Sequence, residues 1–280
     1  ILWGGNLDAP ISAFLGNTSP NNFYGFRSRV GTDGFRFIAH DSEHTLLNVS
    51  EDRSGPFAAG NSAVSASNPQ WVWQKMWANA EFRVQTGDRV HRHFFNNGVL
   101  TAEGARALFL QRKEEIDRAV VGESARWGDA KVTTPFTRAT WLAEINNILN
   151  NFIPQRTAVV LGQLKAKGLY PSVAAPTFNQ HGGPINAGFA LSMTAPAGTL
   201  YYTLDGSDPR LRGGAVAPGA LTYSRAVTLN ESVRVNSRAL VGTNWSALNT
   251  AEFAVIQSFT NLVLTEIMYH PADDPDIDPD

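Results

Sequence analysis

Hydrophobic side chains recur at helical spacing through residues 70–167. After Thr101 they follow an i, i+3, i+4 pattern, which predicts a helix whose first free amide groups are capped by the Thr101 hydroxyl. A second helix is expected after Pro135, and Pro154 is expected to break it and to open a third that ends at Gly168. The side chains predicted to form the core of these helices are Ala105, Leu108, Phe109, Ile116, Ala119, Val120, Trp141, Ile145, Ile148, Leu149 and Phe152.

Residues 1–60 have a different pattern, rich in Asn, Gly and Asp, with one strand signal. Residues 35–39 alternate and then become apolar, so we expect a strand that ends just before Asp41. Ligand sites in sheet proteins often lie at such strand ends. The basic residues of 27–36 lie among aromatic ones, which favours a packed sheet edge.

The pattern changes again at residues 168–171. From there to about residue 256, short β-type runs alternate with Gly, Pro, Asn and Asp, and no helical period intervenes. This spacing predicts an antiparallel sandwich of immunoglobulin-like type with a tight turn at Asp205-Gly206. The expected fold class is multidomain, an α+β part followed by an all-β part. Strands are expected at 199–204, 226–229, 233–240, 251–256 and 262–267.

The composition is that of a globular chain long enough for two domains, with 280 residues, 43% hydrophobic and 17% charged. A net charge of -2 argues against nucleic-acid binding through a broad basic face. The absence of cysteine excludes disulfides and Cys-ligated zinc, and no run approaches the roughly 20 apolar residues of a membrane span. Because the chain starts at Ile1 and ends in the acidic run 273–280, we expect an internal fragment of a larger protein.

The residues best suited to chemistry lie in the first fifty positions. An Asp and an Asn from neighbouring loops can hold Mg²⁺ through oxygen ligands, and a separate Asp can accept the proton of an attacking hydroxyl. The other reading is that these residues cap turns, as Asn and Asp do in most loops. Spacing alone leaves both readings open for Asn6, Asp8, Asn21, Asn22, Asp41, Glu43 and His44.

The histidines carry a weaker signal. His91 and His93 could form a metal pair, but positions i and i+2 of a helix face different ways, so a polar helix edge is favoured. His40 and His44 flank Asp41, and we expect hydrogen-bonded structural roles for both.

Three ordered motifs at the start of the chain resemble the CotH (spore coat protein H) kinase family: 5–11 (GNLDAPI), 20–27 (PNNFYGFR) and 35–46 (FRFIAHDSEHTL). Residues 71–95 and 115–129 extend the resemblance, which covers roughly residues 1–170. More closely, the motifs are similar to versions found in large secreted proteins of environmental bacteria. The resemblance implies an extracellular or cell-surface location and an atypical kinase fold that uses ATP and a divalent metal, Mg²⁺, to phosphorylate protein hydroxyls.

Carried over by motif, Asp8 matches the catalytic-loop aspartate, Asn22 the metal-binding asparagine and Asp41 the metal-binding aspartate at a strand end. Glu43 is a candidate for an accessory polar role. The thirteen residues between Asp8 and Asn22 exceed the spacing in ordinary protein kinases, so their partnership depends on an inserted loop. The glycine-rich loop and nucleotide-binding lysine of the family would lie upstream of Ile1, so we expect the fragment alone to bind ATP poorly.

Residues 176–255 resemble the chitobiase/β-hexosaminidase C-terminal domain, above all in the run 201–210 (YYTLDGSDPR). The Asp side chains of this run predict a tight turn capped by Asp205 and Asp208, a structural role that requires no active site. An exposed Tyr or Trp245 could contact a polysaccharide. Residues 262–271 resemble the first strand of a lamin tail domain, which, unpaired, should be disordered or pair with the sandwich edge.

The expected domains are 1–170 (kinase-like C-lobe remnant), 171–257 (β-sandwich) and 258–280 (start of a lamin tail domain). The leading hypothesis is Mg-ATP-dependent phosphoryl transfer by the intact parent to a secreted or surface protein, with Asp8 as base and Asn22 and Asp41 as metal ligands. One rival is a non-catalytic extracellular scaffold or adhesion protein with a spacer or glycan-contacting sandwich. Another is a polysaccharide-processing enzyme whose catalytic domain lies outside these residues.

Overall fold

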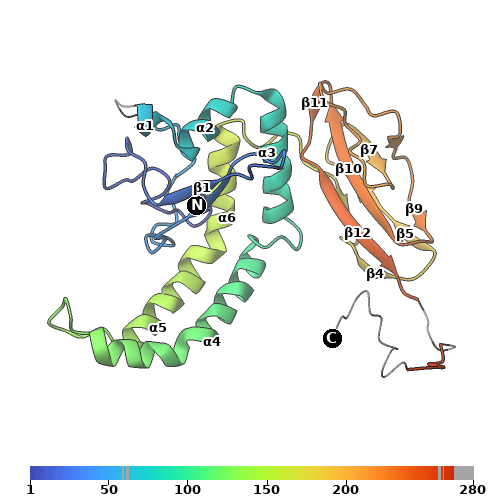
Figure 1. Ribbon diagram of the computed structural model, residues 1–280. Coiled ribbons are helices and arrows are strands. Elements are labelled where there is room, and N and C mark those ends of the chain that lie inside the picture. The colour runs from blue at the N-terminus through green and yellow to red at the C-terminus, as the bar shows by residue number, and fades with distance from the viewer. Residues whose placement is uncertain (59, 61–62, 258–259, 261, 268–280) are drawn as a thin grey trace, which may run out of the picture.

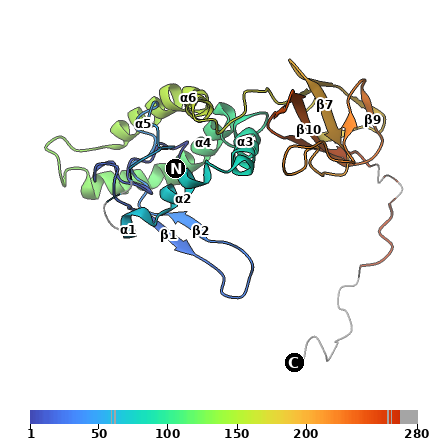
Figure 2. The same cartoon turned by 90° about the horizontal axis from the view of Figure 1, so that it is seen from above.

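The computed structural model describes residues 1–58, 60, 63–257, 260 and 262–267. It has a first part of helices and one small hairpin, and a second part built from strands. Figures 1 and 2 show the two parts side by side, with the linker after α6 and the helix α3 at their boundary. The α+β and β-sandwich classes expected from the sequence are both present.

The helices of the first part begin where the sequence offers caps. Asn68 accepts from the Trp71 amide and opens α2, and Thr101 accepts from the Gly104 amide at 3.0 Å and opens α4, as predicted. The helices are α1 (Ala63–Ala66), α2 (Pro69–Met76), α3 (Ala80–Phe94), α4 (Ala102–Trp127), α5 (Arg138–Asn147) and α6 (Ile153–Ala166).

The predicted break at Pro154 is only half right. The second helix, α5, begins at Arg138 behind a Thr137 cap, and a π-helical segment (Ile148–Phe152) joins it to α6 without a gap. Pro154 has no amide hydrogen, and it lies in the first turn of α6, where that loss is tolerated. The chain therefore changes its helical hydrogen bonding before Pro154 instead of stopping there. The predicted end is confirmed, because α6 stops at Ala166 and Gly168 adopts a φ of 66°.

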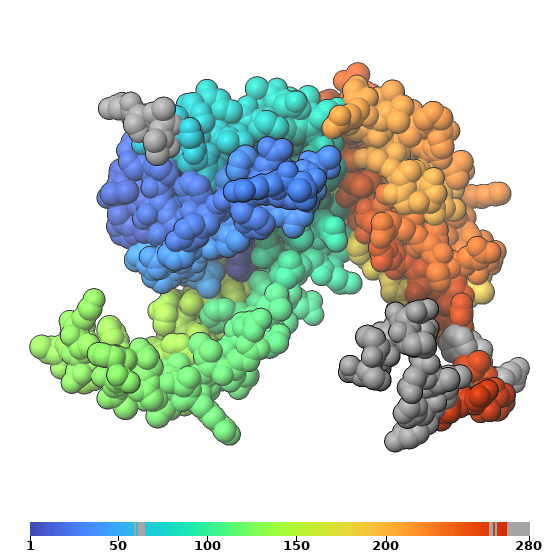
Figure 3. All heavy atoms as spheres, viewed as in Figure 1, coloured from blue at the N-terminus to red at the C-terminus, as the bar shows by residue number. Residues whose placement is uncertain are grey.

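The predicted apolar stripe of α5 and the π-helix is confirmed, but that of α4 is wrong beyond its first turns. Ile145, Leu149 and Phe152 are buried together with Ala105. Ile116, by contrast, is 49% exposed. The reason is that α4 leaves the core and runs outward with the start of α5 as an arm, which Figures 1 and 3 show projecting from the molecule.

The strand predicted at 35–39 is confirmed as β2 (Arg36–Ala39), and it pairs antiparallel with β1 (Phe23–Phe26). The predicted packed sheet edge is wrong, however. Every residue of 24–40 is exposed, and Figure 2 shows the hairpin extending away from the helices. No third strand among the described residues covers either of its faces.

The second part is built around one sheet with the order β4-β12-β10-β7-β8, and β11 pairs with β10. In this sheet β7, β10 and β12 lie at predicted positions, whereas β4, β8 and β11 were not predicted, and all pairs are antiparallel except β4 with β12. The remaining pairs, β3-β6 and β5-β9, are antiparallel. The bounds are β3 (Thr177–Phe178), β4 (Gly183–Ile185), β5 (Phe189–Leu191), β6 (Met193–Thr194), β7 (Thr199–Thr203), β8 (Leu221–Thr222), β9 (Val227–Leu229), β10 (Val233–Val241), β11 (Asn244–Trp245) and β12 (Asn249–Val255).

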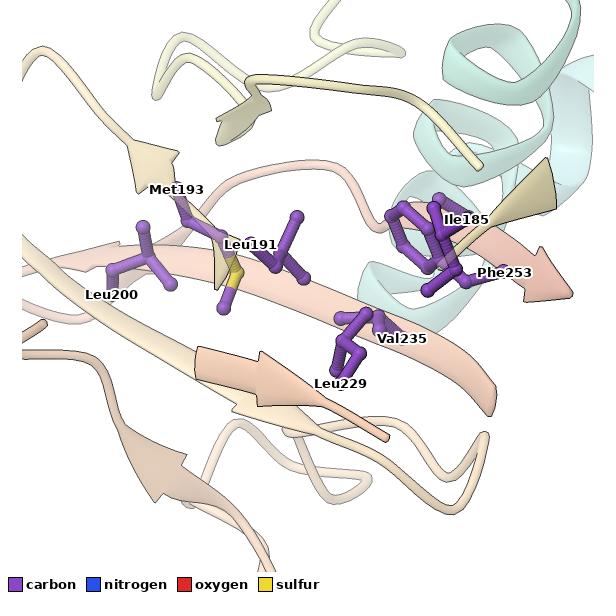
Figure 4. Packing of buried hydrophobic residues seen from close by; sticks show 8 residues of the cluster. Ile185, Leu191, Met193, Leu200, Leu229, Val235 and Phe253 are labelled. Atoms are coloured by element: carbon purple, nitrogen blue, oxygen red, sulfur yellow. The ribbon is translucent and has the colours of Figure 1, made fainter. Parts of the chain in front are cut away.

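Alternation along these strands sends one set of side chains into a common core. Leu200 of β7, Val235 of β10 and Phe253 of β12 meet Leu191 and Leu229 from the β5-β9 pair, as Figure 4 shows. The core therefore lies between the large sheet and the small pairs. The other face of the large sheet turns toward α3.

The strand predicted at 262–267 is not formed. These residues pair with no strand among the described residues, and their large apolar side chains are exposed. A strand gains its ladder hydrogen bonds only from a neighbour, which explains the difference. The rest of the motif, 268–271, lies outside the described residues. Over the described part of the chain, no helix combines the length and apolar character needed to cross a bilayer, as the sequence predicted.

Candidate functional site

Asp8 lies in a buried loop, and its carboxylate contacts one of the other two predicted site residues. Asp8 is only 9% exposed. Its Oδ1 accepts from Asn21 Nδ2 at 3.0 Å, and its Oδ2 accepts from Asn22 Nδ2 at 2.9 Å. The Asp8 amide donates to Asn6 Oδ1 at 2.8 Å, which holds the loop in a tight turn. Four of the seven polar residues singled out in the sequence thus form one cluster.

The surroundings of Asp8 keep its carboxylate ionised. Burial by itself raises the pKa of Asp8, but the polar groups of Ser12, Asn21 and Asn22 and the nearby His44 outweigh burial, so the pKa lies below its usual value. An ionised carboxylate accepts hydrogen bonds and binds cations. The site therefore provides an acceptor at neutral pH and no proton donor at this position.

Asn22 and Asp41 lie at the open end of the β1-β2 hairpin. Asn22 directly precedes β1, Asp41 follows β2, and the His40 amide donates to the Asn22 carbonyl at 3.0 Å. Both residues have positive φ, 51° for Asn22 and 49° for Asp41, a conformation that Asn and Asp tolerate better than other side chains. The pairing of the two strands therefore brings the backbone of Asp41 beside Asn22.

The side chain of Asp41 stands apart from the other two. It is exposed, and it makes no hydrogen bond or ion pair within the described residues. In the same part of the chain, no three His, Cys, Asp or Glu side chains gather into a metal-binding group. The structure thus joins Asp8 to Asn22, while the Asp41 carboxylate has no hydrogen-bonding or ionic partner in the described part of the chain.

The donor chemistry at this end of the hairpin fits Mg²⁺. Since the amide nitrogen of Asn22 is turned to Asp8, its amide oxygen is free of hydrogen bonds to described residues. The Asp41 carboxylate is likewise free, and both are the hard oxygen donors that Mg²⁺ prefers. The ionised carboxylate of Asp8 can accept a proton or a hydrogen bond there, but it cannot donate one.

The two histidines that flank Asp41 have structural contacts. His44 lies 3.2 Å from Glu43, its ring centroid is 4.8 Å from that of Phe14 with the two rings tilted by 57°, and its carbonyl accepts from the Leu7 amide at 3.0 Å. His40 contacts the ring of Tyr24 at 5.1 Å. The predicted structural role is confirmed for His44, whose backbone anchors the loop of Asp8.

Sequence reasoning missed the two buried arginines that hold this loop. Arg156 of α6 is 0% exposed and donates to the carbonyls of Leu2 (2.6 Å), Trp3 (2.7 Å) and Val49 (2.5 Å). Arg53 donates to Asn17 Oδ1 at 2.9 Å and to the Ile11 carbonyl. A signal for Arg156 was present, because it interrupts the apolar stripe of α6 at i+4 from Phe152 and i-4 from Val160.

The predicted polar helix edge is wrong for His91. The ring is buried, its Nδ1 lies 2.9 Å from the Tyr170 hydroxyl, and it stacks on Phe95 at 4.5 Å. Burial lowers the pKa of His91 to about 4, so the ring is neutral at physiological pH. Tyr170 of the linker packs against His91 and helps to bury it.

The turn after β7 behaves as predicted. Asp205 Oδ1 accepts from the Ser207 amide at 2.9 Å, and Asp208 Oδ1 accepts from the Arg210 amide at 2.9 Å. Trp245 does not match the suggested sugar contact, because it is only 7% exposed and donates to the Gly214 carbonyl at 2.7 Å. A buried ring cannot offer its face to a polysaccharide.

Comparison with known proteins identifies one family over part of the chain. The model of the family described as Fn3 associated matches residues 189–253. No curated protein matches the chain. The match runs from β5 to β12 and covers well under half of the chain. It therefore shows what the β-sandwich is similar to, which is the Fn3 associated family.

Proposed function

We propose that residues 1–170 are a kinase-like lobe and that the intact protein transfers phosphate from Mg-ATP to protein hydroxyls. The observation that carries this proposal is the contact between Asp8 and Asn22, at the end of the hairpin where Asp41 follows β2. A base hydrogen-bonded to one oxygen ligand, with a second oxygen ligand following the neighbouring strand, supplies the kinds of group that phosphoryl transfer requires. The resemblance of residues 1–46 to the CotH kinase family supports the same assignment.

Each residue has a distinct role in this proposal. Asp8, ionised and held by Asn21 and Asn22, accepts the proton of the attacking hydroxyl. The amide oxygen of Asn22 and the carboxylate of Asp41 hold Mg²⁺, which neutralises charge on the phosphate oxygens. Arg156 positions the loop of Asp8 by fixing the backbone that precedes it.

The proposal is tested with Mg²⁺ and radiolabelled ATP on the intact protein, including the segment upstream of Ile1, with casein as added acceptor and Mn²⁺ binding followed by electron paramagnetic resonance. Asp41→Asn should weaken Mn²⁺ binding, and Asp8→Asn should lower transfer by about 10²-fold or more while leaving Mn²⁺ binding intact. The matched control is Asp33→Asn, because Asp33 is exposed on the same hairpin and pairs only with Arg36. Transfer that survives both Asp8→Asn and Asp41→Asn unchanged contradicts the proposal.

A second candidate is a non-catalytic protein of the cell surface or extracellular space. It is favoured by the ion pairs between the two parts of the chain, in which Arg210 and Arg238 of the sandwich meet Glu81 and Asp88 of α3. Such pairs suit a load-bearing spacer that carries partner proteins or polysaccharide. Absence of both Mn²⁺ binding and transfer in the unaltered intact protein would favour this scaffold.

A further inference from the structure

Helix α3 turns one face toward the β-sandwich, and that face carries two carboxylates. Glu81 and Asp88 are seven positions apart, close to two helical turns, so both project from the same side of α3. His91 follows less than one turn later, and its ring is also buried on the sandwich side against Tyr170. This spacing presents two negative charges to one surface.

The first carboxylate is held by the turn that follows β7. Both terminal nitrogens of Arg210 donate hydrogen bonds to the Glu81 carboxylate, at 2.7 and 2.8 Å. The Gly213 amide donates a third at 2.9 Å. Two parallel bonds to one carboxylate fix its orientation as well as its distance. Because Asp208 accepts from the Arg210 amide, the same capped turn that the sequence predicted presents Arg210 to α3.

The second carboxylate meets an arginine that is 0% exposed. Arg238 of β10 bonds Asp88 at 2.7 and 2.8 Å, Asp208 at 2.6 and 2.7 Å, and the Ser246 carbonyl at 2.8 Å. All five donor hydrogens of the guanidinium are thereby used. Asp88 also accepts from the Leu248 amide at 2.8 Å. Without Asp88, Arg238 would keep a buried charge with only half of its carboxylate partners.

The linker between the two parts is fitted to the same helix. A methyl group added at Gly87 would come within 2.8 Å of Pro171 Cδ, closer than packed atoms approach. At the other end, Asn249 of β12 accepts from Asn96, just after α3, and from His181. Contacts thus extend along the whole helix, from Glu81 to Asn96.

We propose that the sandwich is a docking module for α3 and that its charged surface is a receptor for a helix bearing carboxylates two turns apart. In the intact chain, α3 occupies this surface permanently. The two parts then form one rigid unit that persists when the linker is cut. The turn of residues 205–213 serves this contact and is closed to other ligands while α3 is bound.

The test uses the full chain with a protease site inserted at Ser172–Ala174, where Ser172 and Ala174 are exposed. After folding, the linker is cut and the product is run on size-exclusion chromatography at about 1 μM, without and with about 0.5 M NaCl. The two pieces should elute together in both conditions, since the arginines are buried and screened little. Immediate separation of the unaltered pieces overturns the proposal.

Variants then assign the binding to the two carboxylates. Asp88→Asn with Glu81→Gln should weaken the association of the cut pieces by about 100-fold or more. The matched control is Glu252→Gln in β12. This change removes the carboxylate from the exposed ion pair that Glu252 forms with Arg234 of β10. The control should leave the pieces together. Equal affinity of the double variant and the control overturns the proposal.

A folding defect is separated from a docking defect before cutting. Circular dichroism and tryptophan fluorescence of the uncut double variant report whether both parts remain folded. If the double variant is unfolded, Glu81→Gln alone replaces it, because Glu81 is only partly buried and lies at the edge of the contact. The single variant should weaken the association by about tenfold, and an unchanged affinity again contradicts the proposal.

Discussion

Three arginines of this chain have side chains that are almost fully buried, and each holds segments that are distant in the sequence. Arg53 and Arg156 bind the loops around Asp8, and Arg238 binds Asp88. A buried guanidinium is costly to remove from water, and it is retained only where most of its donors find acceptors. Each of these arginines therefore makes the structure around it sensitive to a single substitution.

Arg156→Met should destabilise the protein by about 3 kcal/mol or more, because three backbone carbonyls lose charged donors inside the protein. Urea unfolding followed by tryptophan fluorescence measures the change. Arg112→Met is the matched control, since Arg112 of α4 is exposed and its loss should cost less than about 0.5 kcal/mol. Equal losses for the two variants would contradict the role given to Arg156.

At the scale of elements, α4 and the start of α5 form an arm that has few buried side chains and carries several ion pairs. Beyond Leu110 no residue of helix α4 is buried, and Asp117 links Lys113 at 2.9 Å to Arg138 at 2.5 and 2.8 Å. These bonds lower the pKa of Asp117, foremost through Arg138. Ion pairs at the surface of a protein stabilise little, so the arm depends on helix propensity and capping more than α6 does.

Amides of residues 112–127 should exchange hydrogen at least about tenfold faster than those of α6, because few apolar contacts oppose local opening of the arm. Hydrogen exchange with mass spectrometry of the full chain gives both rates in one experiment. Helix α6 is the internal control, since Val160 and Leu164 are buried. Equal protection in the two helices would show that the arm is packed as firmly as the core.

At the scale of the whole molecule, ion pairs of α3 with the sandwich join the two parts of the chain. Figure 3 shows the β-sandwich lying against the part of the surface formed by α3. The contact contains two groups whose pKa values are lowered, Glu81 and His91. Hydrogen bonds from Arg210 and from the Gly213 amide lower the pKa of Glu81 from 4.5 to about 2. Burial, followed by the charges of His181 and Arg238, lowers the pKa of His91 from 6.5 to about 4.

Stability should therefore fall in two steps as the pH is lowered. Between pH 6.5 and about 4, the unfolded chain protonates His91 while the folded chain does not, so each step toward acid favours unfolding. Between pH 4.5 and about 2, the unfolded chain protonates Glu81 first, and the stability that its ionised form contributes is lost. Urea unfolding over this pH range measures both steps.

Two variants separate these steps. His91→Phe keeps a ring to stack on Phe95 and should flatten the curve above pH 4.5. Glu81→Gln should reduce the slope below pH 4.5, where Asp8 and Asp117 still titrate, and leave the upper range unchanged. An upper slope that persists in His91→Phe would mean that another group titrates there.

Several features could be predicted from the sequence because their causes are local. Thr101 caps the helix that follows it, Asp205 and Asp208 cap their turn, and the apolar period of 141–152 marks the side that is buried. The strands at 199–203 and 233–241 likewise lie where short β-type runs in the sequence predicted them. Neighbours along the chain decide each of these.

The proximity of Asp8 to Asn22 could be anticipated only through resemblance, and the partners of the buried arginines could not be anticipated, although the position of Arg156 within an apolar stripe indicated its burial. Arg156 bonds residues more than a hundred positions away, and Arg238 bonds Asp88 at a separation of 150. Likewise, the exposed hairpin and the outward course of α4 depend on which segments lie beside them. Local patterns thus determined the elements by themselves. Only the tertiary structure decided which charges are buried and which apolar faces remain open, because burial is set by partners distant in the sequence.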